Sequence, residues 1–94
     1  MMSQLPIDLT KVSKKDLDAE ILRVGIIAEL DAINLYEQMA AVAQDKNIKA
    51  MLLDIAKEEK THVGEFQTLL LNRDAQQVRE LKAGREEIKK EVGE

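Results

Sequence analysis

The chain has 94 residues, enough for one small domain, and its formal net charge of −4 excludes the basic surface typical of nucleic-acid binding. One Tyr, one Phe and no Trp, with 34% charged residues, favour an aliphatic helical protein over a β-sandwich or barrel. The absence of cysteine excludes disulfides and thiolate metal sites and is compatible with a cytoplasmic location. No apolar run reaches the roughly 18 residues of a membrane span, so no membrane partner is expected.

The first third of the chain predicts an arm followed by a long helix. Residues 1–12 lack periodicity and contain Pro6, so an extended arm is expected there. Ser13 is a candidate cap for a helix over residues 14–43. Two apolar stripes run along this helix, so it is expected to be buried on more than one side. The first stripe is Leu17, Ile21, Val24, Ala28, Asp31 and Leu35, and the second is Leu22, Ile26, Glu29, Ile33, Tyr36 and Ala40.

Two further helices are predicted after a turn over residues 44–47. The second helix is expected over 48–72 and the third, shorter helix over 75–91. Sparse apolar residues and alternating charges on the third helix favour a solvated helix with exposed ion pairs. Residues that can cap these two helices are Asp45, Asn47 and Asp74. The fold class is therefore all-α, an antiparallel two-helix hairpin followed by a shorter helix.

Glu59 and His62 form a Glu-x-x-His pair that interrupts the apolar seam of the second helix. Three residues along a helix are about 300° of rotation and about 4.5 Å of rise, so the two side chains share one face. A lone pair of this kind is more often a surface or hydrogen-bonded histidine than a ligand. Burial of both groups without partners would cost several kcal/mol, however, and a metal cation would suit both. The seam reads Ile48, Leu52, Ile55, Glu59, His62, Phe66 and Leu69.

Glu29 makes the metal interpretation stronger. It interrupts an apolar stripe of the first helix, 30 residues before Glu59, and the midpoint between the two is Gln44 in the expected turn. In an antiparallel hairpin both carboxylates then lie at nearly the same height, roughly 22 Å from the turn. Two seam carboxylates and one imidazole are therefore expected to converge at one level.

These three residues are half of a known ligand set. Four-helix di-iron carboxylate bundles take one Glu from each of two helices and a Glu-x-x-His from each of the other two. Two copies of this chain about a two-fold axis would supply the whole set. Carboxylate and imidazole ligands favour iron, with manganese or zinc as competitors. The sequence thus predicts a di-iron centre shared by a homodimer that forms a four-helix bundle.

Two more residues are candidates near this centre. Tyr36 lies seven residues after Glu29, on the same side of the helix, so its hydroxyl is expected to reach a ligand carboxylate or an iron-bound species. A core tyrosine with a satisfied hydroxyl is the alternative. Asp31 interrupts the other stripe of the first helix and is a candidate for gathering cations on their way in.

The spacing of Glu29, Tyr36, Glu59 and His62 resembles that of the encapsulated ferritins, short ferritin-like proteins with half of the usual bundle. The resemblance covers about residues 14–73 and a third helix of fitting length. It implies a single ferritin-like domain over residues 1–94.

The resemblance also implies a function. Members of this family form a two-fold dimer with a di-iron ferroxidase centre at its interface, and dimers associate into a homodecamer of five dimers. They oxidise Fe(II) to Fe(III) inside an encapsulin nanocompartment in the cytoplasm, whose shell stores the iron. Glu29, Glu59 and His62 take the metal-ligand positions, and Tyr36 takes that of the nearby tyrosine.

The chain departs from the family pattern at two places. The family has two acidic residues where iron enters, whereas here Asp31 is acidic and the other position is Ala28. The residues from Lys89 to Glu94 do not resemble the usual peptide that targets the shell. Some relatives in thermophiles resemble ferritin-like domains fused to the shell protein, which favours the hypothesis that this chain is such a domain.

The main hypothesis is a ferroxidase in which Glu59 bridges two irons while Glu29 and His62 are terminal ligands. One alternative is a non-catalytic helical assembly module, in which the same three residues form a buried polar network that sets dimer register. Another is a di-iron peroxidase of the rubrerythrin kind, although those bundles usually carry both halves in one chain.

Overall fold

The computed structural model describes residues 8–94, and every regular element in that range is a helix. A 3-10 turn, η1, spans Leu9–Lys11 and precedes the long helix α1, Lys14–Val42. Helix α2 spans Lys46–Leu71, and the shorter helix α3 spans Ala75–Val92. The expected all-α class, a hairpin followed by a shorter helix, is confirmed.

The start of the chain differs from the sequence-based expectation. The part of the expected arm over residues 1–7 lies outside the described residues, and residues 8–12 contain η1 instead of only extended backbone. Ser13 is the N-cap residue of α1, but its side chain makes no capping bond. Its hydroxyl instead donates to Asp16 Oδ2 at 2.8 Å, because that carboxylate lies one turn away in the first turn of the helix.

The connection between α1 and α2 is shorter than expected because Asp45 caps α2. Its Oδ1 accepts hydrogen bonds from the backbone N–H groups of Asn47 and Ile48, at 2.8 and 3.0 Å. Helix α2 therefore begins at Lys46, and Asn47 lies inside the helix. Only residues 43–45 separate the two helices, so the turn is still centred on Gln44.

Replacement of Asp45 by Ala is expected to lower the free energy of unfolding by about 1 kcal/mol, because two backbone donors lose their acceptor. Urea unfolding followed by circular dichroism measures this change. Asp45→Asn is the matched control, since Asn caps helices about as well as Asp. An equal loss in both variants would show that the charge, not the cap, stabilises α2.

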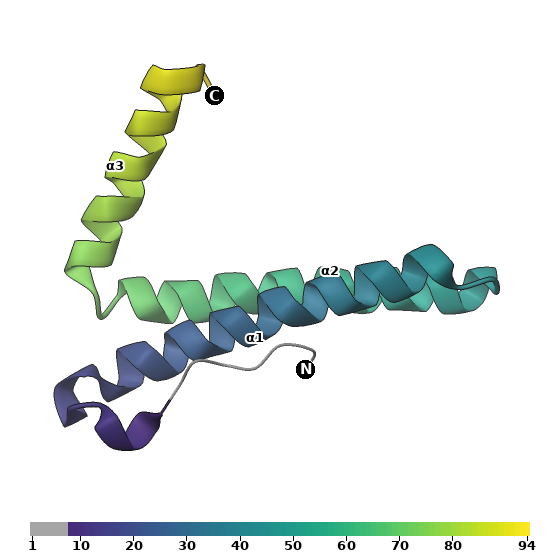
Figure 1. The fold of residues 1–94 in the computed structure, drawn as a ribbon, viewed down its shortest axis with the longest axis horizontal. Helices are drawn as coiled ribbons and strands as arrows, with labels where there is room; N and C mark the ends of the chain where they lie inside the picture. The colour runs from purple at the N-terminus through teal and green to yellow at the C-terminus, as the bar shows by residue number, and fades with distance from the viewer. Residues whose placement is uncertain (1–7) are drawn as a thin grey trace.

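Helices α1 and α2 lie side by side along their lengths and run antiparallel (Figure 1). Each of these two helices contributes two of the buried residues found within residues 8–94. These four are Ile33 and Ala40 on α1 and Ala56 and Leu70 on α2. The expected seam of α2 is only half-buried over most of its length, and Ile48 and Leu69 at its ends are exposed. A single hairpin can cover its apolar stripes only in part.

The chain exposes more surface than a compact protein of its mass. Its accessible area is 7467 Å², whereas a compact chain of 10.6 kDa would expose about 5,500 Å². The radius of gyration is 16.6 Å, against about 12 Å for a compact chain of this length. Several large apolar residues of the hairpin are exposed. Exposed apolar residues of α1 and α2 include Ile21, Ile27, Leu30, Met39, Val42, Ile48, Met51, Leu53 and Leu69.

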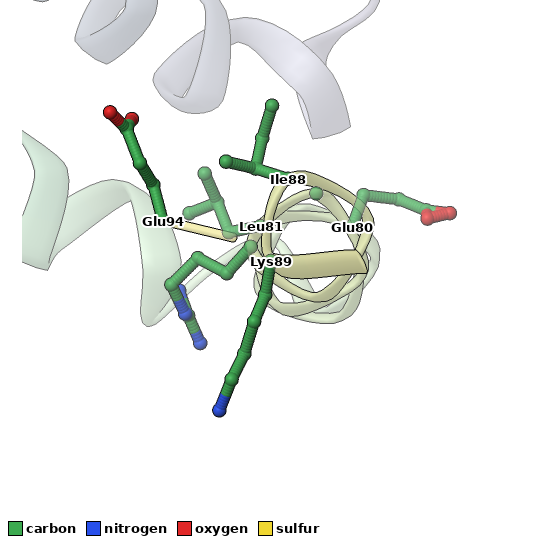
Figure 2. Close-up of a pocket in the computed structure, with 7 residues that line it drawn as sticks. Glu80, Leu81, Ile88, Lys89 and Glu94 are labelled. Atoms are coloured by element: carbon green, nitrogen blue, oxygen red, sulfur yellow. The ribbon is translucent and has the colours of Figure 1, made fainter. Parts of the chain in front are cut away.

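Helix α3 projects away from the hairpin (Figure 1). Asp74 caps it by accepting a hydrogen bond from the backbone N–H of Gln77 at 2.9 Å, as expected, and also lies 3.6 Å from Arg23 of α1. A surface hollow of about 650 Å³ lies along α3, where Leu81 and Ile88 point to the same side (Figure 2). The residues that line this hollow belong to α3 and the C-terminus alone, so it is an open surface and not an enclosing cleft.

Within residues 8–94, no helix is both long enough and apolar enough to cross a membrane.

Candidate metal centre

Helix α2 presents Glu59 and His62 from one face because the two are three residues apart. His62 Nδ1 lies 3.2 Å from Glu59 Oε2, a hydrogen-bonding distance. Both positions belong to the apolar seam identified in the sequence, on the half-buried side of α2. Local helix geometry alone accounts for this pairing.

Glu29 reaches the same point from α1. Its Oε2 lies 3.5 Å from His62 Nδ1, across the hairpin. One ligand atom from each of Glu29, Glu59 and His62 lies within 4.8 Å of the other two, close enough for a metal ion. The short turn centred on Gln44 holds the two helices in the register that this convergence requires.

The cluster is half-buried, and it is more open at the imidazole than at the carboxylates. The side chains of Glu29 and Glu59 are each 19% exposed, whereas that of His62 is 44% exposed. Glu29 Oε2 is completely covered, yet it accepts no hydrogen bond from the part of the chain described. Its 3.5 Å contact with His62 satisfies the distance of an ion pair, but not the geometry of a hydrogen bond.

A covered carboxylate oxygen without a donor is costly. Here it adjoins a second carboxylate, so one imidazole faces two acidic side chains. His62 carries at most one proton on Nδ1 and cannot give a full hydrogen bond to both. A divalent cation between the three groups would remove this deficit, because it pairs with both carboxylates and accepts the imidazole lone pair.

Three ligands from one chain make an incomplete site for two metal ions. The donors are two carboxylate oxygens and one imidazole nitrogen, a set that suits iron and that manganese or zinc can share. His62 is the most exposed of the three side chains, so the cluster is accessible from outside the chain there. The residues present therefore fit iron, with room for ligands from outside the chain.

The two other sequence candidates also lie on α1. Tyr36 is half-buried on α1, about two turns beyond Glu29. Asp31 is also half-buried, but two residues along a helix are about 200° of rotation, so it faces away from Glu29. Asp31 is not without an interaction partner.

Sequence reasoning missed two contacts across the hairpin near this centre. Lys60 Nζ of α2 lies 3.0 Å from Glu37 Oε2 of α1, an exposed pair that flanks Glu59. Gly25 of α1 lies against the ring of Phe66 of α2. A glycine inside an otherwise helical pattern was the signal for the second contact, because such a residue usually has a packing reason.

Fold and site together define an all-helical protein whose hairpin carries a carboxylate and histidine cluster of the kind found in ferritin-like bundles. A model of the EncFtn-like family matches residues 5–84. The crystal structure of the encapsulated ferritin domain from Pyrococcus furiosus is similar to this chain, with a TM-score of 0.86 and 55% identity. That match covers 100% of this chain and 98% of the other.

Two curated proteins are also similar. A ferritin-like-encapsulin shell fusion protein of Pyrococcus furiosus is 65% identical over 74 residues, which are 79% of this chain and 21% of the fusion protein. The encapsulin nanocompartment cargo protein EncC of Myxococcus xanthus is 36% identical over 69 residues, 70% of this chain and 53% of that protein. The chain thus spans about a fifth of the first relative and about half of the second.

This chain belongs to the EncFtn-like family of encapsulated ferritins. The resemblance inferred from Glu29, Tyr36, Glu59 and His62 is confirmed at the level of the family.

Proposed function

We propose that this protein is a ferroxidase, which oxidises Fe(II) to Fe(III) at a di-iron site shared by two copies of the chain. The observation that carries the proposal is the covered, unpartnered Oε2 of Glu29 beside Glu59 and His62. A plain structural hairpin has no need of this arrangement, because an apolar residue at position 29 would avoid the cost. Membership of a ferritin family supports iron as the ion.

The chemistry of the site and the apolar surface both support dimerisation. One chain supplies Glu29, Glu59 and His62, half of the ligand set of a di-iron bundle. The unusually large accessible area leaves apolar surface on the hairpin for a second copy to cover. In the proposed dimer the two hairpins form a four-helix bundle, and further association of five such dimers gives the decamer expected from the family.

In this mechanism Fe(II) is the substrate, and each ion gives one electron to dioxygen. Glu29 and Glu59 favour the product state, because anionic ligands interact more strongly with Fe(III) than with Fe(II). His62 would supply a nitrogen ligand through its Nδ1, which lies 3.5 Å from Glu29 Oε2 and 3.2 Å from Glu59 Oε2. Glu59 would hold both ions, and Glu29 and His62 would each hold one. Tyr36 is proposed to donate a hydrogen bond near the site, and Asp31 to attract incoming cations.

The proposed partner is an encapsulin shell protein. One relative is named as a fusion of a ferritin-like protein with the shell, and another as a cargo protein of the compartment. We therefore propose that this chain works inside an encapsulin nanocompartment in the cytoplasm, where it supplies oxidised iron for storage.

Native mass spectrometry with metal analysis, before and after anaerobic addition of Fe(II), tests this proposal. We expect oligomers with an even number of chains and about two irons bound per dimer after the addition. His62→Ala should retain the fold and bind less iron, because a ligand is lost. Protein that takes up no iron would favour the non-catalytic assembly module. Iron-loaded protein that reduces hydrogen peroxide much faster than dioxygen would favour the rubrerythrin-like peroxidase.

A further inference from the structure

Gly25 and Phe66 meet across the hairpin one helical turn from the metal centre. Gly25 lies four residues before Glu29 on α1, and Phe66 lies four residues after His62 on α2. The antiparallel register that places Glu29 against His62 therefore also places Gly25 against Phe66, about 6 Å further along the helices. The two contacts are consecutive layers of one interface.

The approach between these two residues is unusually close. A Cβ atom at position 25 would lie 3.1 Å from Cε1 and Cζ of the Phe66 ring and 3.2 Å from Cδ1. These distances are shorter than ordinary van der Waals contact, so either the ring or the helix would have to shift by a few tenths of an ångström. One whole edge of the ring thus lies against the backbone of α1.

Space, and not backbone conformation, is what Gly25 provides. Among residues 8–94 only Gly93 has a positive φ, so position 25 has a helical backbone that alanine would adopt readily. Glycine inside a helix is less favourable than alanine. Glycine at position 25 therefore makes α1 less stable than alanine would, but it allows Phe66 of α2 to lie closer to the backbone of α1.

The direction of the side chains connects this contact to the metal ligands. Side chains of a helix lean toward its N-terminus. On α2 the Phe66 ring therefore leans toward the level of His62. On α1 the Glu29 carboxylate leans toward the level of Gly25. Both side chains therefore lean into the space between the two layers.

We infer that Gly25 and Phe66 are positioning residues, which set the distance between α1 and α2 at the metal centre and so hold Glu29 against Glu59 and His62. The inference rests on the proposed function, since it concerns how tightly the centre binds Fe(II). A bulkier residue at position 25 would move the ring or separate the helices, and Glu29 would leave its place 3.5 Å from His62. Metal sites are sensitive to such displacements because ligand geometry depends on supporting residues.

The test compares Gly25→Ala with Gly64→Ala, a matched control in α2 with no atom within 4 Å of the added Cβ. Both variants replace a helical glycine by alanine, but only the first crowds the site. Anaerobic titration with Fe(II) is expected to show about tenfold weaker binding for Gly25→Ala and no change for Gly64→Ala. The visible spectrum of bound Co(II) should change in the first variant only, because it reports ligand geometry. Circular dichroism on heating monitors the fold of each variant.

A double variant separates positioning from loss of packing. In Gly25→Ala/Phe66→Leu the smaller side chain makes room for the Cβ, so Fe(II) affinity is expected to agree with that of Phe66→Leu alone within about threefold. This comparison decides the matter if Gly25→Ala alone does not fold. The inference is overturned if Gly25→Ala binds Fe(II) like the wild type, or if the double variant binds it far more weakly than Phe66→Leu. Wild-type protein that binds no Fe(II) would instead overturn the proposed function, and this inference with it.

Discussion

Glu59→Ala is expected to slow Fe(II) oxidation by more than about 100-fold, since loss of even an outer-shell partner of a metal ligand costs 10–100-fold. The Glu59 carboxylate lies close to the ligand atoms of both His62 and Glu29. Its removal takes away the ligand that is proposed to bridge the two irons. Glu29→Ala and His62→Ala should show losses of the same order. The measurement is the initial rate of Fe(III) formation followed by absorbance, with oxygen consumption recorded in parallel.

Glu58→Ala is the matched control for this series. Glu58 is the neighbour of Glu59 in the same helix and is exposed, so the control removes the same charge without touching the cluster. It should oxidise Fe(II) at nearly the wild-type rate. If Glu59→Ala, Glu29→Ala and His62→Ala all matched the wild type, the ferroxidase proposal would be wrong.

Mixing inactive and active chains is expected to suppress the activity of the active ones. In a site shared by two copies, a wild-type chain paired with Glu59→Ala lacks one of the six ligands, the second of the two proposed bridging carboxylates, and is expected to be inactive. After co-refolding with a threefold excess of Glu59→Ala, activity per wild-type chain should fall to about one quarter, the fraction of wild-type chains that pair with each other at random. Fe(II) oxidation measures the activity, and a mass tag on one chain identifies the mixed dimers.

Co-refolding with an equal excess of Glu58→Ala controls for dilution and refolding losses. These chains carry an intact cluster, so activity per chain should stay constant. Activity per wild-type chain that does not change in the presence of mixed dimers would show that each chain holds a complete site.

The helices and their faces were largely predictable, whereas several local contacts were not. Asp45 was a candidate cap, but the sequence placed α2 two residues too late, because Asn47 was an equally good capping residue. Ser13 looked like a cap, yet its hydroxyl bonds to the carboxylate of Asp16. Short polar side chains have several partners within reach, and only the folded geometry selects one of them.

Burial was predicted less well than helix position. The apolar seam of α2 marks a face suited to burial, but in the single chain Ile48 and Leu69 of this seam are exposed, while Ala56 and Leu70, which lie outside it, are buried. Periodicity tells which residues share a face, but not the rotation at which a neighbouring helix meets that face. The contact between Gly25 and Phe66 was missed for the same reason, since helix separation has no signature in spacing.

The sequence by itself determined that Glu29, Glu59 and His62 would lie at one level of a hairpin. The rise and rotation per residue of a helix are nearly constant. The short turn centred on Gln44 therefore fixes which residues of α1 lie opposite which residues of α2. Only the tertiary structure decided how close the three groups lie, which imidazole nitrogen faces the carboxylates, and that one oxygen of Glu29 is covered without a donor. These features depend on the separation of α1 and α2 and on side-chain rotamers, which packing sets after the helices have formed.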